Sequence, residues 1–345
     1  MRNIIVISHS SDIDGVGSAA LIKMKYRVPT SRIFFTDYAP KSLERVSRDV
    51  KAQLSKGTTL FITDLGVNGN ALSVFQDMLE SVKAAGGEVF WFDHHPWSSG
   101  AARKLAHLCK LAVFGENDMY CAAEITRMEL GFKDSFTKNF CRIVHLSDFA
   151  ITPKAKSDYN TVGTYALSIS LYRMKSHEGN IRSLRHMVDV ICSRRLVDNR
   201  IRQDADRFRA LNDRHVEAML KDVYLGRDIA IGFAADIQKT YACMKLIEKT
   251  GRDIGVYINL RDRRGHMRSI RNDCTMLASK FGGGGHPHAS GFSPDFRKYR
   301  YFRTKKGRLK LLADMESELA AINKRKGKMP TAQIKASHAR TPLFG

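Results

Sequence analysis

Aspartates and histidines directly follow short apolar runs at three places in the N-terminal part of the sequence. The three segments are His9-Ser-Ser-Asp12-Ile-Asp14-Gly15, Thr63-Asp64-Leu65-Gly66 and Asp93-His94-His95-Pro96. A fourth segment, His145-Leu-Ser-Asp148-Phe149, adds another acid within a stretch of helical pattern. Each has an ordinary structural explanation when taken alone, because aspartates cap helices and close turns. Together they predict chemistry that uses clustered carboxylates and imidazoles.

Such a cluster is typical of a metal site. Ligands bind at the carboxyl ends of strands in an open parallel sheet, so the first three segments would meet on one rim. Carboxylates at such short range repel one another unless cations lie between them. Oxygen and imidazole donors without thiolate favour Mn²⁺ or Mg²⁺ over a structural zinc ion. Two such ions about 3.5–4 Å apart clamp the attacking and leaving oxygens of a phosphoryl displacement. One carboxylate must bridge the two ions, and Asp64, a lone aspartate at the end of a middle strand, is the natural candidate.

A run of four glycines, Gly282 to Gly285, precedes His286. Consecutive glycines permit positive φ and expose backbone N–H groups to an anion without hindrance from side chains. A flexible linker is the alternative, but the run lies between a predicted helix that ends at Phe281 and the apolar segment Ala289–Phe292. We therefore predict an anion site at Gly283, Gly284 and Gly285, with His286 contacting a phosphate or a base.

The elements that must position these residues alternate along the chain. Apolar runs predict strands at residues 4–7, 32–35, 60–62 and 89–92, and amphipathic segments predict helices at 15–26, 42–54 and 71–84. Continuously apolar strands separated by helices indicate a parallel sheet covered on both faces. Helical patterns dominate from about residue 118 to 173. The charged stretch 180–221 lacks Gly and Pro and fits one long connecting helix.

A second α/β pattern begins near Val223. Strands are predicted at residues 228–234, 254–260 and 266–270, and helices at 238–249 and 274–281. The predicted fold class is therefore α/β, with an N-terminal doubly wound parallel-sheet domain, a helical connector and a smaller C-terminal α/β domain. The predicted boundaries are 1–175, 176–221 and 222–300, followed by a helical extension and a basic, disordered tail over 301–345.

The charge of the sequence favours a polyanionic partner. Its 345 residues include 57 Lys+Arg and 35 Asp+Glu, a formal net charge of +22. Such an excess favours binding to a polyanion, because neutralising its phosphates releases condensed counterions. A basic protein without such a partner is the alternative.

The sequence also bears on location. No stretch approaches the roughly 18 apolar residues of a membrane span, and the first apolar run is too short for a signal peptide. With six scattered cysteines and no C-x-x-C pair, the sequence predicts a cytoplasmic protein without a membrane partner.

The motifs together resemble the DHH phosphoesterase superfamily. Asp93-His94-His95 matches its name-giving motif, the segment from Ser8 to Ser18 resembles its first motif, and Phe61–Gly66 resembles its second. Asp148 fills the position of the fourth. The glycine run with His286 resembles the signature of the associated DHHA1 substrate domain. The motifs occur in the family's order, but the His9-x-x-Asp12 spacing differs by one residue from some branches, which leaves the subfamily open.

The resemblance implies two metal ions and their ligands. One ion would be held by His9, Asp12 and Asp64, and the other by Asp14, Asp64, His94 and Asp148. Asp158 and Asp118 compete with Asp148 for the last position. Asp93 would orient an imidazole from outside the ligand set, as metal sites usually require. His95 would face the substrate phosphate or assist the leaving oxygen.

The resemblance also implies the substrate class. In the DHHA1 domain, Arg268 and Arg271 would bind substrate, with Arg261 as a third candidate. The chain looks most like the compact nano-RNases, which degrade short RNA or DNA oligonucleotides to mononucleotides; some also cleave 3′-phosphoadenosine 5′-phosphate. A RecJ-like single-strand exonuclease and a cyclic- or linear-dinucleotide phosphodiesterase are alternatives, as is a nucleic-acid-binding module with an inactive metal site. The expected cofactors are two Mn²⁺ ions, with Mg²⁺ as the other candidate, and the sequence is compatible with a homodimer.

Overall fold

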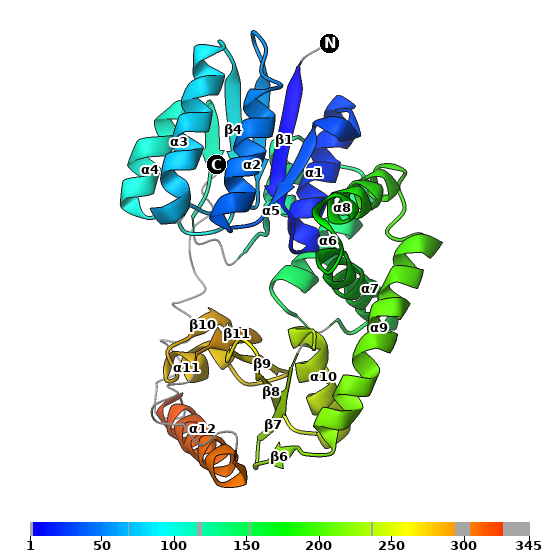
Figure 1. Ribbon diagram of the computed structural model, residues 1–345, viewed down its shortest axis with the longest axis vertical. Coiled ribbons are helices and arrows are strands. Elements are labelled where there is room, and N and C mark those ends of the chain that lie inside the picture. Colours follow the sequence, from blue (N-terminus) through cyan, green and yellow to red (C-terminus); the bar gives the residue numbers. More distant parts are fainter. Residues whose placement is uncertain are drawn as a thin grey trace. The chain divides into compact units, whose positions relative to one another are not determined.

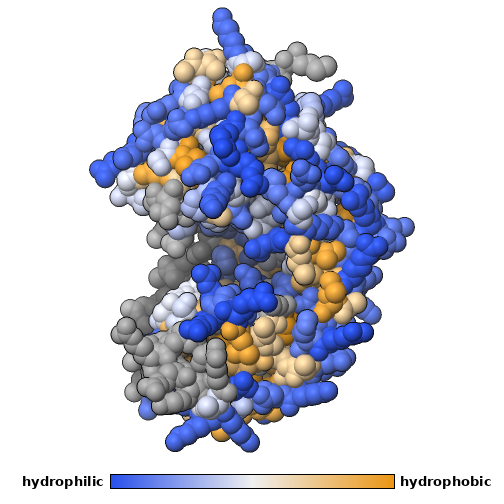
Figure 2. Space-filling view, in the orientation of Figure 1, coloured by the Kyte–Doolittle hydropathy of each residue, from blue (hydrophilic) through white to orange (hydrophobic). Residues whose placement is uncertain are grey.

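The chain divides into two compact units, Met1–Ala210 and Leu211–Gly345 (Figure 1). The computed structural model describes residues 3–67, 69–115, 119–151, 153–235, 237–293 and 304–326. The face drawn in Figure 2 is largely hydrophilic, with hydrophobic side chains in small patches. Within the described residues, no helix is long and apolar enough to cross a membrane.

The N-terminal unit is built on a five-stranded parallel sheet. Its strands are β1 (Ile4–His9), β2 (Ile33–Thr36), β3 (Thr59–Thr63), β4 (Glu88–Phe92) and β5 (Leu111–Val113), in the order β2-β1-β3-β4-β5. The parallel sheet and its first four strands confirm the pattern seen in the sequence. β5 was not predicted, because three residues are too few to show a periodicity. The order reverses between β1 and β3, and ligands bind at such a switch point in open α/β sheets.

Helices cover both faces of this sheet. They are α1 (Ile13–Tyr26), α2 (Pro40–Lys51), α3 (Gly69–Ala84), α4 (Ser99–Leu105), α5 (Ala122–Glu129), α6 (Ser135–Asp148), α7 (Lys156–Arg173) and α8 (His177–Cys192). Ile4 and Val6 of β1 pack with α1 and α5 to α8. Their neighbours Ile5 and Ile7 pack on the opposite face with α2, α3 and α4. The alternation places successive residues of one apolar strand in two separate cores, which confirms the doubly wound arrangement.

The single helix predicted over residues 180–221 is wrong. The stretch forms two helices, α8 and α9 (Asn199–Leu220). Between them Arg194 has a φ of +59°, the left-handed conformation that ends helices. The side chain of Asp198 then accepts a hydrogen bond from the backbone N–H of Ile201 at 2.9 Å and starts α9. Without a glycine or proline at the break, the sequence carried no strong marker for it.

The C-terminal unit contains a six-stranded mixed sheet. Its strands are β6 (Tyr224–Leu225), β7 (Ile229–Ala234), β8 (Ile254–Asn259), β9 (Gly265–Ser269), β10 (Gly284–His286) and β11 (Ala289–Phe292), in the order β10-β11-β9-β8-β7-β6. Only β7 and β8 run parallel; the other described pairs are antiparallel. The helix α10 (Lys239–Thr250) packs on one face, and α11 (Cys274–Ser279) and α12 (Lys305–Lys326) pack on the other.

The predicted boundaries at 175, 221 and 300 remain predictions. The compact units divide instead between Ala210 and Leu211, within α9. Residues 327–345, which hold most of the predicted basic tail, lie outside the described residues.

Candidate functional site

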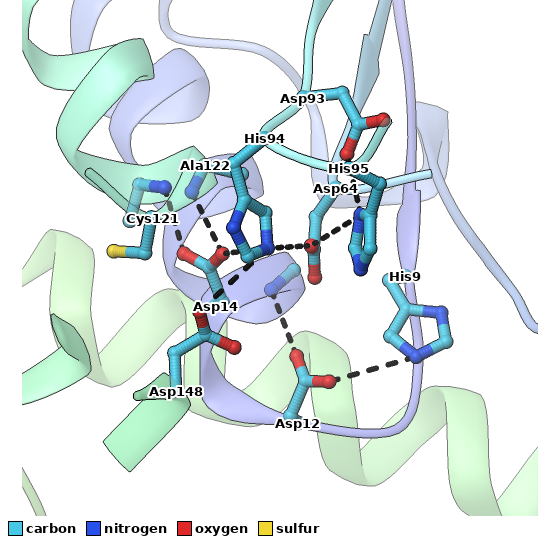
Figure 3. Close-up of polar contacts among 12 residues, drawn as sticks. His9, Asp12, Asp14, Asp64, Asp93, His94, His95, Cys121, Ala122 and Asp148 are labelled. Carbon is cyan, nitrogen blue, oxygen red and sulfur yellow. Dashed lines mark hydrogen bonds and ion pairs between the residues drawn. The ribbon is translucent and has the colours of Figure 1, made fainter. Parts of the chain in front are cut away.

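Carboxylates and imidazoles from three strand ends gather at the switch point of the parallel sheet (Figure 3). His9 is the last residue of β1, Asp64 follows β3, and Asp93-His94-His95 follow β4. Asp148, the last residue of α6, approaches the same cluster. The strand ends therefore bring these residues together, as expected for an open parallel sheet.

The backbone of Asp64 has an unusual conformation. Its φ is +55°, in the left-handed region that aspartate tolerates better than most residues. Two contacts hold this turn: the N–H of Asp64 donates to the carbonyl of Phe92 at 3.0 Å, and Nε1 of Trp91 donates to the carbonyl of Leu65 at 3.1 Å. Strain of this kind costs of order 1–3 kcal/mol and persists where surrounding structure fixes it. The turn aims a nearly fully buried carboxylate into the cluster.

Gly66 continues this turn and packs against the imidazole motif. A Cβ at Gly66 would lie 2.8 Å from Cβ of His95, so a side chain does not fit there. The N–H of Gly66 donates to the hydroxyl of Tyr38 at 3.2 Å. Burial and the neighbouring charge of Asp64 raise the pKa of Tyr38, so its hydroxyl stays protonated. Tyr38 was not predicted from the sequence, because it lies outside every recognisable motif.

The two aspartates of the first motif have different structural roles. Asp12 caps α1, since its Oδ1 accepts from the N–H of Gly15 at 3.2 Å. Asp14 is fully buried and binds the N-terminus of α5 instead, where the N–H groups of Ala122 and Ala123 donate to its two oxygens at 2.8 and 2.7 Å. The positive end of a helix dipole stabilises a carboxylate in this position. Helix α5 therefore fixes the orientation of Asp14 within the cluster.

His94 is the centre of the cluster. Its Nε2 lies 3.6 Å from Oδ2 of Asp148, 3.7 Å from Oδ1 of Asp64 and 3.9 Å from Oδ2 of Asp14. Two groups of three residues have potential ligand atoms within 4.8 Å of one another: Asp14 with His94 and Asp148, and Asp64 with His94 and His95. Both groups could hold a metal ion. Asp158 and Asp118 were the alternatives to Asp148 as the last metal ligand. Asp158 pairs with Arg142 instead, and Asp118 lies outside the described residues.

His9 and Asp12 form a pair beside these two groups. Nε2 of His9 lies 3.5 Å from Oδ2 of Asp12, and in the described structure neither residue belongs to a group of three. Burial lowers the pKa of His9. Burial alone would raise the pKa of Asp12, but His9, the hydrogen bond from Gly15 and a contact with the carboxyl of Asp64 lower it. Asp12 therefore remains ionised next to Asp64, where it can contribute charge to a bound cation.

The buried polar atoms of the cluster indicate whether it is suited to bind cations. Oδ2 of Asp64, Oδ2 of Asp148 and Nδ1 of His9 are buried without a hydrogen-bond partner in the described part of the chain. Leaving such an atom unsatisfied costs about 1–3 kcal/mol, and more for a charged group. These atoms are donors of the type that Mn²⁺ and Mg²⁺ accept. Their burial and orientation fit a metal site.

The protonation of the cluster leads to the same conclusion. Burial and the neighbouring Asp12 raise the pKa of Asp14 to about 7. Burial and other carboxylates raise the pKa values of Asp64 and Asp148 well above the usual range. Burial and Asp14 raise the pKa of the nearby Cys121 thiol as well, which leaves it neutral and disfavours a thiolate ligand. Protons thus hold positions that divalent cations would take over.

Asp93 lies behind the cluster and contacts His95. Its Oδ1 is 2.7 Å from Nδ1 of His95, and Nε1 of Trp97 donates to its Oδ2 at 3.0 Å. With the carboxylate oxygen as acceptor, Nδ1–H of His95 donates to Asp93, and Nε2 lies on the other side of the ring. Although burial lowers the pKa of His95, the hydrogen bond and charge of Asp93 raise it above the ordinary value. Trp97 was not predicted from the sequence, because no local pattern marks it as a partner of Asp93.

A cavity of about 320 Å³ occupies the C-terminal unit beside the glycine run. Gly283, Gly284, Gly285 and Arg268 line it, and Arg268 donates to Oγ1 of Thr240 at 2.9 Å. Lys239, Arg264 and His266 also line the cavity and were not predicted. Burial and the charge of Lys239 lower the pKa of His266 to about 4, as expected in a cationic environment.

The glycine run is part of a β-hairpin rather than an open loop. Gly284–His286 form β10, which pairs with β11. A Cβ at Gly283 would lie 2.1 Å from the carbonyl oxygen of Gly291, and one at Gly285 would lie 2.6 Å from that of Ala289. Close approach of the two strands therefore requires glycine at these positions.

The other predicted substrate residues lie away from the cavity lining. Nε of Arg271 lies 3.1 Å from Oδ1 of Asp253, whose carboxylate holds the arginine outside the cavity. Arg261 lies in the turn after β8, and His286 forms part of β10; neither lines the cavity. Arg268 is thus the predicted arginine that the structure places at the cavity.

No protein-family model matches the chain, and no curated protein matches it in sequence. Solved structures are similar in fold. The pGpG-specific phosphodiesterase PggH from Vibrio cholerae is 12% identical, with a TM-score of 0.50 over 91% of this chain and 99% of that one. RecJ in complex with Mn²⁺ from Thermus thermophilus is 14% identical, with a TM-score of 0.44 over 95% and 52%. An uncharacterized protein from Helicobacter pylori is 14% identical, with a TM-score of 0.43 over 90% and 99%. The resemblance to the phosphodiesterase extends over both units and establishes a shared α/β fold.

Proposed function

We propose that this chain is a two-metal phosphoesterase of the DHH superfamily that hydrolyses short oligonucleotides, including linear dinucleotides, to mononucleotides. The observation that carries the proposal is the buried cluster at the switch point, where carboxylate oxygens of Asp64 and Asp148 lack hydrogen-bond partners among the described residues. Buried carboxylates that approach one another in this way are usually neutralised by cations. The family motifs, in their order along the chain, support the same assignment.

The metal ligands proposed are those implied by the motifs: His9, Asp12, Asp14, Asp64, His94 and Asp148. When bound, paired Mn²⁺ or Mg²⁺ ions would polarise the phosphate and supply a nucleophilic water. Asp64 is the proposed bridging ligand, because its carboxylate lies 3.7 Å from His94 and also contacts Asp12, which pairs with His9. Asp14 is held by the N-terminus of α5, so the ligand needs little reorganisation.

His95 is the proposed proton donor to the leaving oxygen. Asp93 fixes the imidazole through Nδ1 and raises its pKa, which favours the protonated form near neutral pH. A protonated Nε2 can then donate to an alkoxide as the phosphate ester bond breaks. Asp93 acts through His95 and contacts no substrate in this proposal.

The cavity of the C-terminal unit is the proposed site for a further phosphate or sugar of the substrate. Its volume lies at the lower end of small-ligand pockets, and it is lined by Arg268, whose guanidinium donates to the neutral hydroxyl of Thr240. Lys239 and Arg264 add positive charge. Arginine recognises phosphate through several donors at once, which suits this position.

One protein of similar fold, PggH, is described as a pGpG-specific phosphodiesterase. A linear dinucleotide is therefore included in the proposed substrate range, beside short RNA or DNA oligonucleotides and 3′-phosphoadenosine 5′-phosphate. A RecJ-like activity on long single strands is the second candidate, supported by the net charge of +22. Contacts to a long strand would weaken steeply with salt, by a slope near 0.7 per phosphate.

Hydrolysis of labelled RNA of different lengths tests the proposal. A dinucleotide, a pentanucleotide and a long strand are incubated with the full chain and Mn²⁺, Mg²⁺ or excess chelator across a salt series. Mononucleotide release should require the metal and be fastest on the short substrates. Asp158→Ala is the matched control, since Asp158 pairs with Arg142 outside the cluster, and it should retain activity. Absence of metal-dependent hydrolysis on every substrate would overturn the proposal, and preference for the long strand at every salt concentration would favour the RecJ-like activity.

A further inference from the structure

Tyr38 lies at the edge of the cluster without a place in the mechanism described so far. It follows β2 and is 37% exposed. The centre of its ring is 5.2 Å from the imidazole of His9 and 6.4 Å from that of His95, which it meets edge-on. An aromatic residue between two imidazoles of the cluster is thus accessible from solvent.

The hydroxyl of Tyr38 is fixed in position. Its oxygen accepts a hydrogen bond from the N–H of Gly66 at 3.2 Å. Gly66 belongs to the turn that also holds Asp64, and it packs against His95 with no room for a side chain. The donor to Tyr38 is therefore part of a rigid segment, and the hydroxyl has little freedom to move.

The hydrogen of this hydroxyl has no acceptor among the described residues. A phenol can donate one hydrogen bond while it accepts others, and Tyr38 uses its oxygen for Gly66. The packing of its ring against His9 would be provided equally well by phenylalanine. Among the described residues, the hydroxyl therefore has one structural contact, and its donor direction is open.

We propose that the Tyr38 hydroxyl donates a hydrogen bond to a non-bridging oxygen of the phosphate bound at the cluster. The inference rests on the proposed phosphoesterase function, since it names a further group that contacts the substrate. The O–H group is preorganised by Gly66, so donating to the phosphate requires no rearrangement of the protein. His9, Tyr38 and His95 then form one edge of the phosphate site.

The variant Tyr38→Phe removes the hydroxyl and keeps the ring. Its matched control is Tyr159→Phe, which alters an exposed tyrosine of α7 that has no described contact with the cluster. Three quantities are measured on the full chain: kcat and KM for a dinucleotide, the affinity of the Mn²⁺-loaded protein for adenosine 5′-monophosphate, and the affinity for Mn²⁺ alone.

Loss of a hydrogen bond to a charged group should lower kcat/KM roughly 10- to 150-fold in Tyr38→Phe. Binding of adenosine 5′-monophosphate should weaken as well, while Mn²⁺ affinity stays at the wild-type value. The control should match wild type in all three. Unchanged kcat/KM and nucleotide affinity in Tyr38→Phe would overturn the inference. A parallel loss of Mn²⁺ affinity would also overturn it, because Tyr38 would then only brace the Asp64 turn.

The nucleotide-binding measurement separates this inference from the proposed function. If the wild-type chain hydrolyses no oligonucleotide, the proposed function fails, but binding of adenosine 5′-monophosphate to the Mn²⁺-loaded protein still tests Tyr38. Weaker binding by Tyr38→Phe than by wild type would support the contact with phosphate. Equal binding would refute it.

Discussion

The metal-free protein should lose stability through Asp14 as the pH rises from 5.0 to 7.5. The pKa of Asp14 is 3.8 in its ordinary state and about 7 in the buried cluster, raised by burial and by Asp12. Between these values the folded chain keeps a proton that the unfolded chain has already released, so stability falls as pH increases. Below about pH 4 this loss of stability has not begun, and above about pH 7 it is complete.

The size of this effect follows from the two pKa values. One pKa unit corresponds to about 1.4 kcal/mol, so the Asp14 contribution falls by about 2–3 kcal/mol between pH 5.0 and 7.5. Asp64 and Asp148, whose pKa values are also raised by burial, change in the same direction. His266 changes in the opposite direction, because its pKa is lowered to about 4 and the folded state favours its neutral form as pH rises. The total pH dependence therefore does not isolate the cluster.

Comparing the wild type with the variant Asp14→Asn isolates the contribution of Asp14 to the pH dependence of stability. Chemical unfolding of both proteins in excess chelator should show that wild-type stability, relative to the variant, falls by about 2–3 kcal/mol over this range. Mn²⁺ displaces the proton, so its stabilisation of the wild type should grow with pH, and the variant should show less of it. A stability difference that is constant or rises with pH would refute the assignment of a raised pKa to Asp14. Equal Mn²⁺ stabilisation of both proteins would refute its role as a ligand.

Three further predictions concern single side chains. Asp64→Ala should remove nearly all turnover and lower the Mn²⁺ content while the chain stays folded; near-normal turnover would show that the bridging assignment is wrong. Asp93→Asn should shift the fall in kcat to lower pH, because the pKa of His95 loses the carboxylate that raises it, and an unchanged pH profile would exclude His95 as the acid. Arg268→Ala should raise KM roughly 10- to 150-fold, whereas Arg271→Ala should leave it nearly unchanged; equal effects would contradict the cavity as a substrate site.

The sequence by itself determined the local elements and the kinds of donor atoms. Buried parallel strands appear as continuous apolar runs, so β1 to β4 were recognisable from residue type alone. Residues that follow such strands must lie at one edge of the sheet, which is why His9, Asp64 and His94 could be predicted to meet. Both inferences depend only on neighbours in the chain and on the direction of the strands.

The partners of each side chain were decided only by the tertiary structure. Asp14 resembles a cap of its own helix, yet its carboxylate binds the N-terminus of α5, more than a hundred residues further along the chain. Arg268 and Arg271 are equivalent in the sequence, but strand register points one to the cavity while Asp253 holds the other outside it. Tyr38 approaches His9 and His95 because β2 lies next to β1 in the sheet. Contacts of this kind depend on strand order and register, and these are set by packing between distant segments rather than by local pattern.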